Sequence, residues 1–346
     1  MPKTPSKSQS VSHAITSGDN ELHVRLAEYA NDARGAFSPN TIRAIKSDVR
    51  HFTAWCEKFN VPALPTTPEV LARYVDEMAR TYAASTIRRR ISSIAHIHRA
   101  AQLTDPIGSD KVRLALRRMQ RSNLTRPKQA QGINENNIAA ILATTGTRLV
   151  DKRDIALLLT TRDILARRSE VVALNVEDIT FNEDGTATVI ICKSKTDQEG
   201  QGSVMWLSAR TVISIREWLS SSNIESGALF RSLRKGDRVT QRLSDNSVAR
   251  LFKSMAKRAG INPQNISGHS ARVGMAQDLS TAGAELTELM TAGRWKSPQM
   301  PARYTERTRA ACGAVAKYYD RSGSGYPEIR DYPHAVRNME RTAHTL

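Results

Sequence analysis

The chain has 346 residues, and its 51 Lys and Arg against 34 Asp and Glu give a formal net charge of +17 at pH 7. This length predicts two domains rather than one core, and such a positive surplus is typical of proteins that bind a polyanion. No apolar run approaches the roughly 20 residues of a membrane span. The three scattered cysteines exclude a disulfide framework and a paired-cysteine zinc site, and the eight histidines form no metal motif, so we expect no metal or other cofactor.

The N-terminal part of the sequence predicts a leader followed by helices. Residues 1–20 are rich in Ser, Lys and Thr without periodicity, which is typical of a flexible segment. In residues 21–121, Ser38-Pro39 and Thr67-Pro68 each place a good N-cap before a proline at the first helical position. Two more helices are expected to begin near Ser85 and Lys111. The helix after Ser38 is expected to bury one apolar face, made of Ile42, Ile45, Val49, Phe52, Cys56 and Phe59.

Three of these helices carry basic side chains opposite their apolar face. On any one helix, a basic face is equally well explained as solvated surface. Three such faces together favour a surface that binds DNA phosphates. The residues expected to contact DNA in this region are Arg43, Lys46, Arg50, Arg88, Arg89, Arg117, Arg118 and Arg121.

The second half of the sequence predicts a mixed domain. Residues 122–132 have no apolar period and contain Pro127, so we expect a linker there, with Lys128 lying along a phosphate backbone. Residues 187–192 and 203–208 predict two strands joined by a polar turn at 193–202. The fold class is therefore mainly α with a small β-sheet in the second domain, 133–321, and residues 322–346 form a tail without an assigned role. Helices are expected at 135–145, 151–162, 168–174, 209–221, 244–259, 270–282 and 285–292.

Five short patches in the second half carry residues suited to phosphate chemistry. Each patch alone has an ordinary structural explanation, such as an ion pair or a solvated lysine. In chain order they combine Arg-x-x-Glu, a lysine in the turn between the strands, His-x-x-Arg, Gly-Arg-Trp, and a tyrosine nine residues after the tryptophan. The residues concerned are Arg167, Glu170, Lys195, His269, Arg272, Trp295 and Tyr304.

This ordered set, downstream of a basic helical region, resembles the tyrosine site-specific recombinases of the phage integrase family. GHSARVG at 268–274 and the Trp-to-Tyr spacing resemble the Cre-like members in particular, as do AFSPNT at 36–41 and LRRMQR at 116–121. The resemblance covers about residues 20–320. It implies a C-shaped clamp around DNA, made of an α-helical core-binding domain and a mixed α/β catalytic domain.

The resemblance also implies a reaction and its partners. The reaction is a metal-free transesterification of double-stranded DNA at two short inverted-repeat sites, through a 3′-phosphotyrosyl intermediate and a Holliday junction. The protein is expected to be a homotetramer on DNA and a monomer free in solution, cytoplasmic and nucleoid-associated, of bacterial, plasmid or phage origin, and without a membrane partner. The groove-facing residues of the second domain would be Ser244, Asn246 and Arg250.

Carried onto this sequence, the resemblance makes Tyr304 the nucleophile. Arg167 and Arg272 would bind the non-bridging phosphate oxygens, because guanidiniums stay charged and stabilise the negative charge that develops there. Lys195 would protonate the departing 5′ oxygen as a general acid. The neighbouring Arg168 leaves open which arginine faces the phosphate, and the spacing to the glutamate favours Arg167.

Three further residues would support this chemistry. His269 can donate to the same oxygens or handle protons. Glu170 would hold the cations or the imidazole in register, and Trp295 would supply packing and an indole donor. Pro301 is expected to begin a helix with Tyr304 in its first turn.

Tyr318 and Tyr319 are alternative nucleophiles, but they close an amphipathic stretch at 308–320. By the resemblance, residues 308–319 would form a helix that docks into the neighbouring protomer of the tetramer. Two other functions fit the basic composition. One is a sequence-specific DNA-binding or architectural protein without catalysis, and the other is a type IB topoisomerase.

Overall fold

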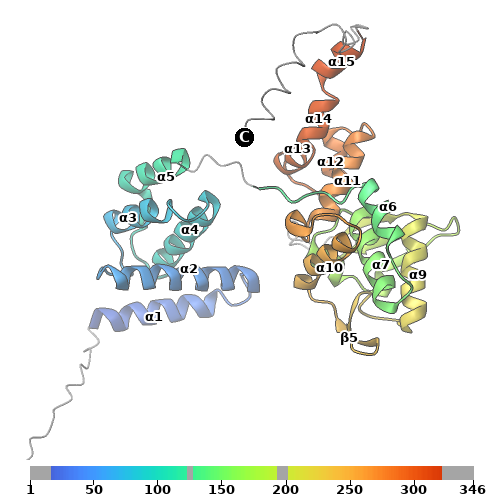
Figure 1. Cartoon of the computed structure of the whole chain (residues 1–346). Helices are drawn as coiled ribbons and strands as arrows, with labels where there is room; N and C mark the ends of the chain where they lie inside the picture. The colour runs from blue at the N-terminus through green and yellow to red at the C-terminus, as the bar shows by residue number, and fades with distance from the viewer. Residues whose placement is uncertain (1–16, 123–127, 193–201, 322–346) are drawn as a thin grey trace, which may run out of the picture. The chain divides into compact units, whose positions relative to one another are not determined.

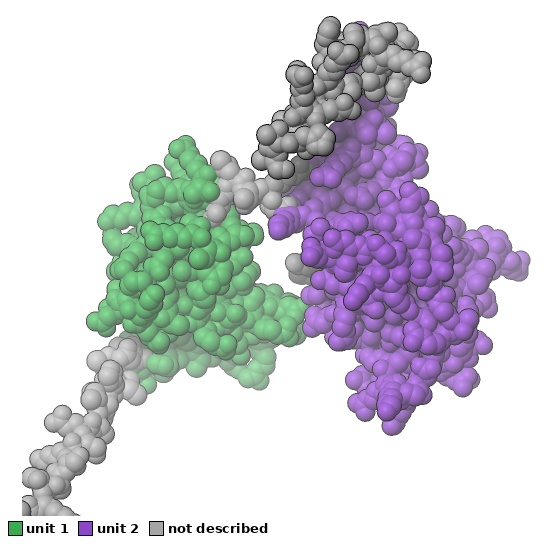
Figure 2. All heavy atoms as spheres, in the orientation of Figure 1, with its two compact units in different colours: residues 1–127 green, residues 128–346 purple. Residues whose placement is uncertain are grey.

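The computed structural model describes residues 17–122, 128–192 and 202–321 (Figure 1). The chain divides into two compact units, residues 1–127 and 128–346 (Figure 2). The division falls inside the stretch 122–132 that the sequence assigns to a linker. The tail at 322–346 lies outside the described residues, as does Lys195 in the turn between the predicted strands.

Unit 1 consists of helices whose starts follow local sequence signals. Ser38 Oγ accepts a hydrogen bond from the backbone N–H of Thr41 at 3.2 Å, and Thr67 Oγ1 accepts one from that of Val70 at 3.4 Å. A proline follows each cap, so both predicted helix starts are confirmed. The helices are α1 (Ser17–Asp32), α2 (Pro39–Lys58), α3 (Pro68–Met78), α4 (Ala84–Ala100), the 3-10 turn η1 (Pro106–Gly108) and α5 (Asp110–Ser122).

The core of unit 1 is rich in aromatic rings. Phe52 and Trp55 of α2 pack against Tyr74 of α3, with ring centroids 4.9 and 5.1 Å from that of Tyr74. The predicted apolar face of α2 is wrong at its N-terminal end, because Ile42 is 40% exposed. The buried residues of α2 begin only at Asp48, so the helix packs on the core from its middle onward.

Unit 2 is mainly helical with two small antiparallel sheets, which confirms the predicted fold class. All helices and strands expected between residues 135 and 292 are present, whereas β1 and the β4–β5 hairpin were not expected. Among the described residues, no helix has both the length and the apolarity to span a lipid bilayer. The elements up to the sheet are α6 (Glu135–Ala143), α7 (Leu149–Asp163), α8 (Arg168–Ala173), β1 (Ile179–Phe181), β2 (Ala187–Ile191) and β3 (Ser203–Leu207).

The sheet order is β1-β2-β3, with Val189 of β2 opposite Met205 of β3. The elements after this sheet are α9 (Ala209–Ser222), β4 (Arg231–Arg234), β5 (Arg238–Arg242), α10 (Asp245–Arg258), α11 (Ser270–Thr281), α12 (Leu286–Gly293), α13 (Gln299–Tyr304), α14 (Glu306–Ala311) and α15 (Ala314–Arg321).

Helix α7 is the centre of unit 2. Its residues 153–162 are all buried, and it packs against α9, α10 and α11. A helix that is covered on every side cannot shift without disturbing the whole core. The end of α7 at Asp163 is therefore held in place by the core. Its position fixes that of the turn that leads into α8.

The segment just before α6 lies directly on α11. The backbone N–H of Ile133 donates to the carbonyl of Ser270 at 2.9 Å, and Arg162 Nη1 donates to the Ile133 carbonyl at 2.8 Å. Gly274 of α11 makes this approach possible, because a Cβ there would lie 2.0 Å from the Ile133 oxygen. The segment thus binds the start of the unit to the helix that follows His269.

Two expectations for the C-terminal part are wrong in detail. The amphipathic helix expected at 308–320 is two helices, α14 and α15, which separate at Cys312 and Gly313. A glycine inside a helix costs about 1 kcal/mol relative to alanine, which favours a break there. Helix α13 begins before Pro301, which is tolerated in the first turn where its missing N–H is not needed. Tyr304 is consequently the last residue of α13 rather than part of its first turn.

Gly274→Ala should destabilise unit 2 by about 3 kcal/mol, because the added Cβ would overlap backbone atoms that cannot move independently. Gly108→Ala is the control, since a Cβ at Gly108 would meet no atom within 4 Å. Calorimetric unfolding of both variants measures the difference. Equal stability of the two variants would contradict the close packing on α11.

Candidate active site

The site is built at the corner between α7 and α8. Leu165 in this corner has a φ of 44°, a left-handed conformation that turns the chain sharply after the buried helix. Arg167 is the N-cap residue of α8, and its backbone N–H donates to Glu170 Oε2 at 2.9 Å. The Arg-x-x-Glu spacing therefore places both side chains on the first turn of one short helix.

The Glu170 carboxylate is buried between two guanidiniums. Its Oε1 accepts from Arg167 Nη1 at 2.5 Å, and its Oε2 accepts from Arg294 Nη2 at 2.8 Å. Arg294 follows α12 with a φ of 54°, and its Nη1 also donates to the carbonyl of Ile164 at 3.0 Å. One carboxylate thus joins the start of α8 to the end of α12.

Arg272 reaches the same corner from α11. Its Nη1 donates to the carbonyl of Leu165, its Nη2 donates to that of Gly293 at 2.5 Å, and its guanidinium lies 4.2 Å from the ring centroid of Trp295. Only glycine fits at position 293, because a Cβ there would lie 1.9 Å from the indole ring. Arg272 is fully enclosed, so its orientation is set by these contacts.

Tyr304 lies beside this cluster. Its ring meets that of Trp295 edge-on, with centroids 5.9 Å apart and an interplanar angle of 70°. The carbonyl of Tyr304 ends α13 and would lack a helical partner. It accepts hydrogen bonds from Gln129 Nε2 at 3.3 Å and from Gln277 Nε2 at 3.2 Å. These two amides hold the end of α13 against α11 and the segment before α6.

His269 immediately precedes α11, and its backbone N–H donates to Ser267 Oγ at 3.1 Å. The adjacent arginine of the first patch, Arg168, points elsewhere, with its Nε 3.3 Å from Asp245 of α10. The structure therefore brings together Arg167, Glu170, Arg272, Trp295 and Tyr304, with His269 at the start of α11, and Lys195 lies outside the described residues.

The cationic groups of the cluster shift the pKa of one another. Burial, with a further contribution from Arg167, lowers the pKa of Arg272 to about 10, which still leaves it charged at neutral pH. Burial would raise the pKa of Glu170, but the hydrogen bonds from Arg167 and the positive charges around it outweigh burial and lower the pKa. The carboxylate is therefore ionised, and the guanidiniums outnumber it.

The pKa shifts of Tyr304 and His269 both favour the neutral form of the side chain. Burial raises the pKa of the Tyr304 phenol, although Arg272, Arg303 and Arg167 oppose that shift. Desolvation lowers the pKa of His269, and the charges of Arg272, Arg168 and Arg167 lower it further. A neutral imidazole is able to accept a proton, and a protonated phenol is able to give one up.

The residues expected to contact DNA are exposed in both units. Several are oriented by neighbours: Arg88 donates to Gln120 at 2.6 Å, and Arg89 pairs with the buried Asp48 at 2.5 Å. Arg118 pairs with Asp76 across α3 and α5 at 2.5 Å. The predicted DNA-contacting residues that are exposed are Arg43, Lys46, Arg50, Arg88, Arg89, Arg117, Arg118 and Arg121 in unit 1, and Lys128, Ser244, Asn246 and Arg250 in unit 2.

Ser244 has a structural role as well, because it is the N-cap of α10 and its Oγ accepts from the Asn246 backbone at 3.4 Å. Gln129 and Gln277 belong to no motif, so the sequence does not predict their contacts with Tyr304. Gly293-Arg294-Trp295 predicts no role for Arg294, and a cation directly before the tryptophan is its one signal in the sequence.

Sequence models of known protein families match residues in both units. The sequence model described as the phage integrase family matches residues 131–310, and that of the phage integrase N-terminal SAM-like domain matches residues 28–103. An integrase/recombinase XerD homolog of Selenomonas ruminantium is 30% identical over 288 residues, which cover 78% of this chain and 82% of the relative. The Cre recombinase of Escherichia phage P1 is 27% identical over 323 residues, covering 88% and 94% of the two chains.

Two solved structures have the same fold. XerH recombinase bound to a palindromic difH substrate superposes with a TM-score of 0.59 at 13% identity, covering 88% of this chain and 99% of that one. A lambda integrase dimer bound to a COC′ core site gives a TM-score of 0.58 at 15% identity, covering 82% and 94%.

His269 should titrate below the value of about 6.5 that is usual for imidazole, because desolvation and the neighbouring guanidiniums disfavour its charged form. NMR titration of histidine-labelled protein without DNA measures this pKa, and His269→Asn assigns the signal. A pKa at or above the usual value would show that Glu170 dominates the field at this ring.

Proposed function

The chain belongs to the phage integrase family and is a tyrosine site-specific recombinase, and from this premise we propose that Tyr304 is its nucleophile. The observation that carries the assignment is the position of Tyr304, which packs on Trp295 while Trp295 packs on Arg272. The phenol thus adjoins a cluster in which guanidiniums outnumber the carboxylate.

In the proposed reaction, the phenolic oxygen of Tyr304 attacks the scissile phosphorus. The bond from phosphorus to the 5′ oxygen breaks, which leaves a 3′-phosphotyrosyl link and a free 5′ hydroxyl. His269 takes the phenolic proton, and Lys195 supplies a proton to the leaving oxygen. A 5′ hydroxyl from the partner strand reverses the steps, so the bond energy is conserved through the Holliday junction and no other reactant is consumed.

Arg167 and Arg272 stabilise the charge that grows on the non-bridging oxygens. Donors that are already oriented give the largest electrostatic benefit, because they need not reorganise during the reaction. The contacts of Arg272 with Leu165 and Gly293 supply that orientation. Arg167 keeps donors that Glu170 does not use, since a guanidinium has five N–H groups.

The DNA partner is double-stranded, with inverted-repeat half-sites. The XerH and lambda integrase structures contain DNA substrates, and this chain shares their fold. In our proposal, the exposed cations of α2, α4 and α5 bind phosphates, while Asn246 and Arg250 of α10 face a groove. The place of action would be the bacterial cytoplasm, on nucleoid, plasmid or phage DNA.

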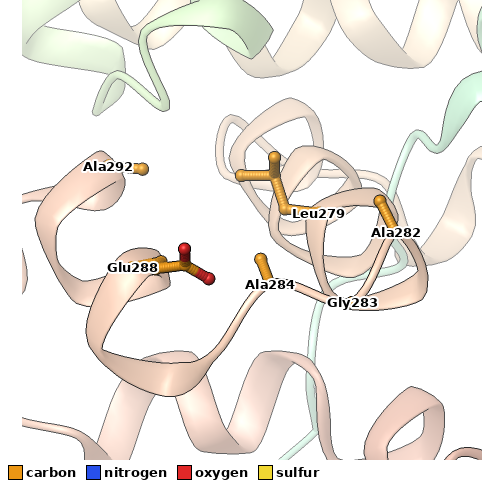
Figure 3. Close-up of a pocket in the computed structure, with 6 residues that line it drawn as sticks. All are labelled: Leu279, Ala282, Gly283, Ala284, Glu288 and Ala292. Atoms are coloured by element: carbon orange, nitrogen blue, oxygen red, sulfur yellow. The ribbon is translucent and has the colours of Figure 1, made fainter.

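The proposed assembly on DNA is a homotetramer formed by α15, from a chain that is monomeric in solution. This helix exposes Val315, Tyr318 and Tyr319, with exposed fractions between 58% and 72%. A hollow of about 440 Å³ lies between the end of α11 and α12, and Figure 3 shows its mostly small, apolar lining. A head-to-tail contact of α15 with this hollow in the next copy can close into a ring. The lining residues are Leu279, Ala282, Gly283, Ala284, Glu288 and Ala292.

Tyr304→Phe should bind DNA as the parent does but form no covalent adduct with a nicked suicide site, because only the attacking oxygen is lost. The ring contact with Trp295 remains. Denaturing electrophoresis detects the adduct, and Tyr318→Phe is the control that should still form it. An adduct with Tyr304→Phe would remove Tyr304 from its role, and no adduct with the parent protein would favour a non-catalytic DNA-binding protein.

Asp in place of both Val315 and Tyr318 should abolish the tetramer on DNA and strand exchange, because charges cannot enter an apolar contact. Binding to a single half-site should change less than about threefold, since α15 contacts the next copy and not DNA in this scheme. Ile213→Asp, which alters an equally exposed apolar residue of α9, is the matched control. Sedimentation of the DNA complexes measures the assembly, and an unchanged tetramer would exclude α15 as the contact.

A further inference from the structure

Building on the proposed function, we propose that Arg294 is a positioning residue that holds Glu170 in place so that Arg167 is free to engage the scissile phosphate. Glu170 pairs with both Arg167 and Arg294. Arg167 and Arg294 use different oxygens of Glu170, at 2.5 and 2.8 Å. Each oxygen therefore has a guanidinium of its own.

The Arg294 guanidinium is held more firmly than that of Arg167. The Arg294 side chain is 10% exposed and is also tied to the Ile164 carbonyl, whereas that of Arg167 is 18% exposed. Arg294 Nε is buried without a partner among the described residues. Within the described ranges, the Arg294 guanidinium donates hydrogen bonds to Glu170 and to the Ile164 carbonyl at the α7–α8 corner, so it acts on the reaction through them.

Charge pairing explains why the reaction needs Arg294. Glu170 is 2% exposed, and a buried carboxylate without a partner is strongly disfavoured. If Arg167 were its only guanidinium, phosphate and carboxylate would compete for Arg167 throughout the reaction. With Arg294 in place, Glu170 remains paired while the Arg167 donors turn to the phosphate.

The backbone conformation at Arg294 indicates that its side chain has a function. The residue has a φ of 54° and caps the C-terminus of α12, a position where glycine is the usual residue. An arginine occupies this strained position instead of glycine, and its guanidinium contacts Glu170. The same position joins Glu170 to Trp295, the residue that stacks on Arg272.

The test compares single-turnover adduct formation at a saturating concentration of nicked site DNA. Arg294→Gly suits the backbone and should fold, yet it should react about tenfold more slowly, as loss of a supporting partner usually does. Its affinity for the site should stay within about threefold, because Arg294 makes no phosphate contact in this scheme. Arg294→Lys should recover part of the rate, since an ammonium can pair with Glu170.

The decisive arm is Glu170→Gln in the Arg294→Gly background. Without a negative charge, residue 170 no longer retains Arg167, so the double variant should be several-fold faster than Arg294→Gly alone. Arg307→Ala, which removes an exposed guanidinium of α14, should react at the parental rate. A double variant as slow as Arg294→Gly, or a parental rate for Arg294→Gly, would overturn the inference. An inactive parent would instead count against the proposed function.

Discussion

The arrangement depends on one buried carboxylate and the guanidiniums around it. Glu170 is accessible neither to water nor to free cations, so its charge must be balanced by side chains of the protein. Arg167 and Arg294 provide that balance, and Arg272 docks on the adjacent carbonyls. The positive charge that remains uncompensated is fixed in space before any phosphate arrives, which is the condition for electrostatic catalysis.

The fold supplies rigidity where this cluster needs it. Helix α7 is buried on all sides, and at its end the carbonyls of Ile164 and of the left-handed Leu165 accept hydrogen bonds from Arg294 and Arg272. A second left-handed residue, Arg294, ends α12 at the opposite side of the cluster. Strained residues of this kind persist where the surrounding structure fixes them, and they are frequent at functional sites.

Local signals in the sequence predict most of the fold. The caps at Ser38 and Thr67 determine helix starts without help from distant residues, whereas the break at Gly313 shows that an apolar period alone does not ensure a continuous helix. The β4–β5 hairpin escaped prediction because its residues are mostly basic or polar, without strand-like alternation.

The family resemblance names the candidate catalytic residues, but it gives no geometry for them. The contact of Arg294 with Glu170 joins residues 124 positions apart, and that of Gln129 with Tyr304 joins residues 175 apart. No sequence pattern reports such pairings, because they depend on how α12 and α13 pack on α11 and how α11 packs on α7.

A crystal structure with a nicked DNA site and orthovanadate tests the central claim most directly, since vanadate adopts the geometry of the transferred phosphate. The account predicts Tyr304 Oη and the 5′ oxygen at the two apices, Arg167 and Arg272 on the equatorial oxygens, and Glu170 still paired with Arg294. A vanadate bound by another tyrosine, or an Arg167 that remains on Glu170 away from the vanadate, would contradict it.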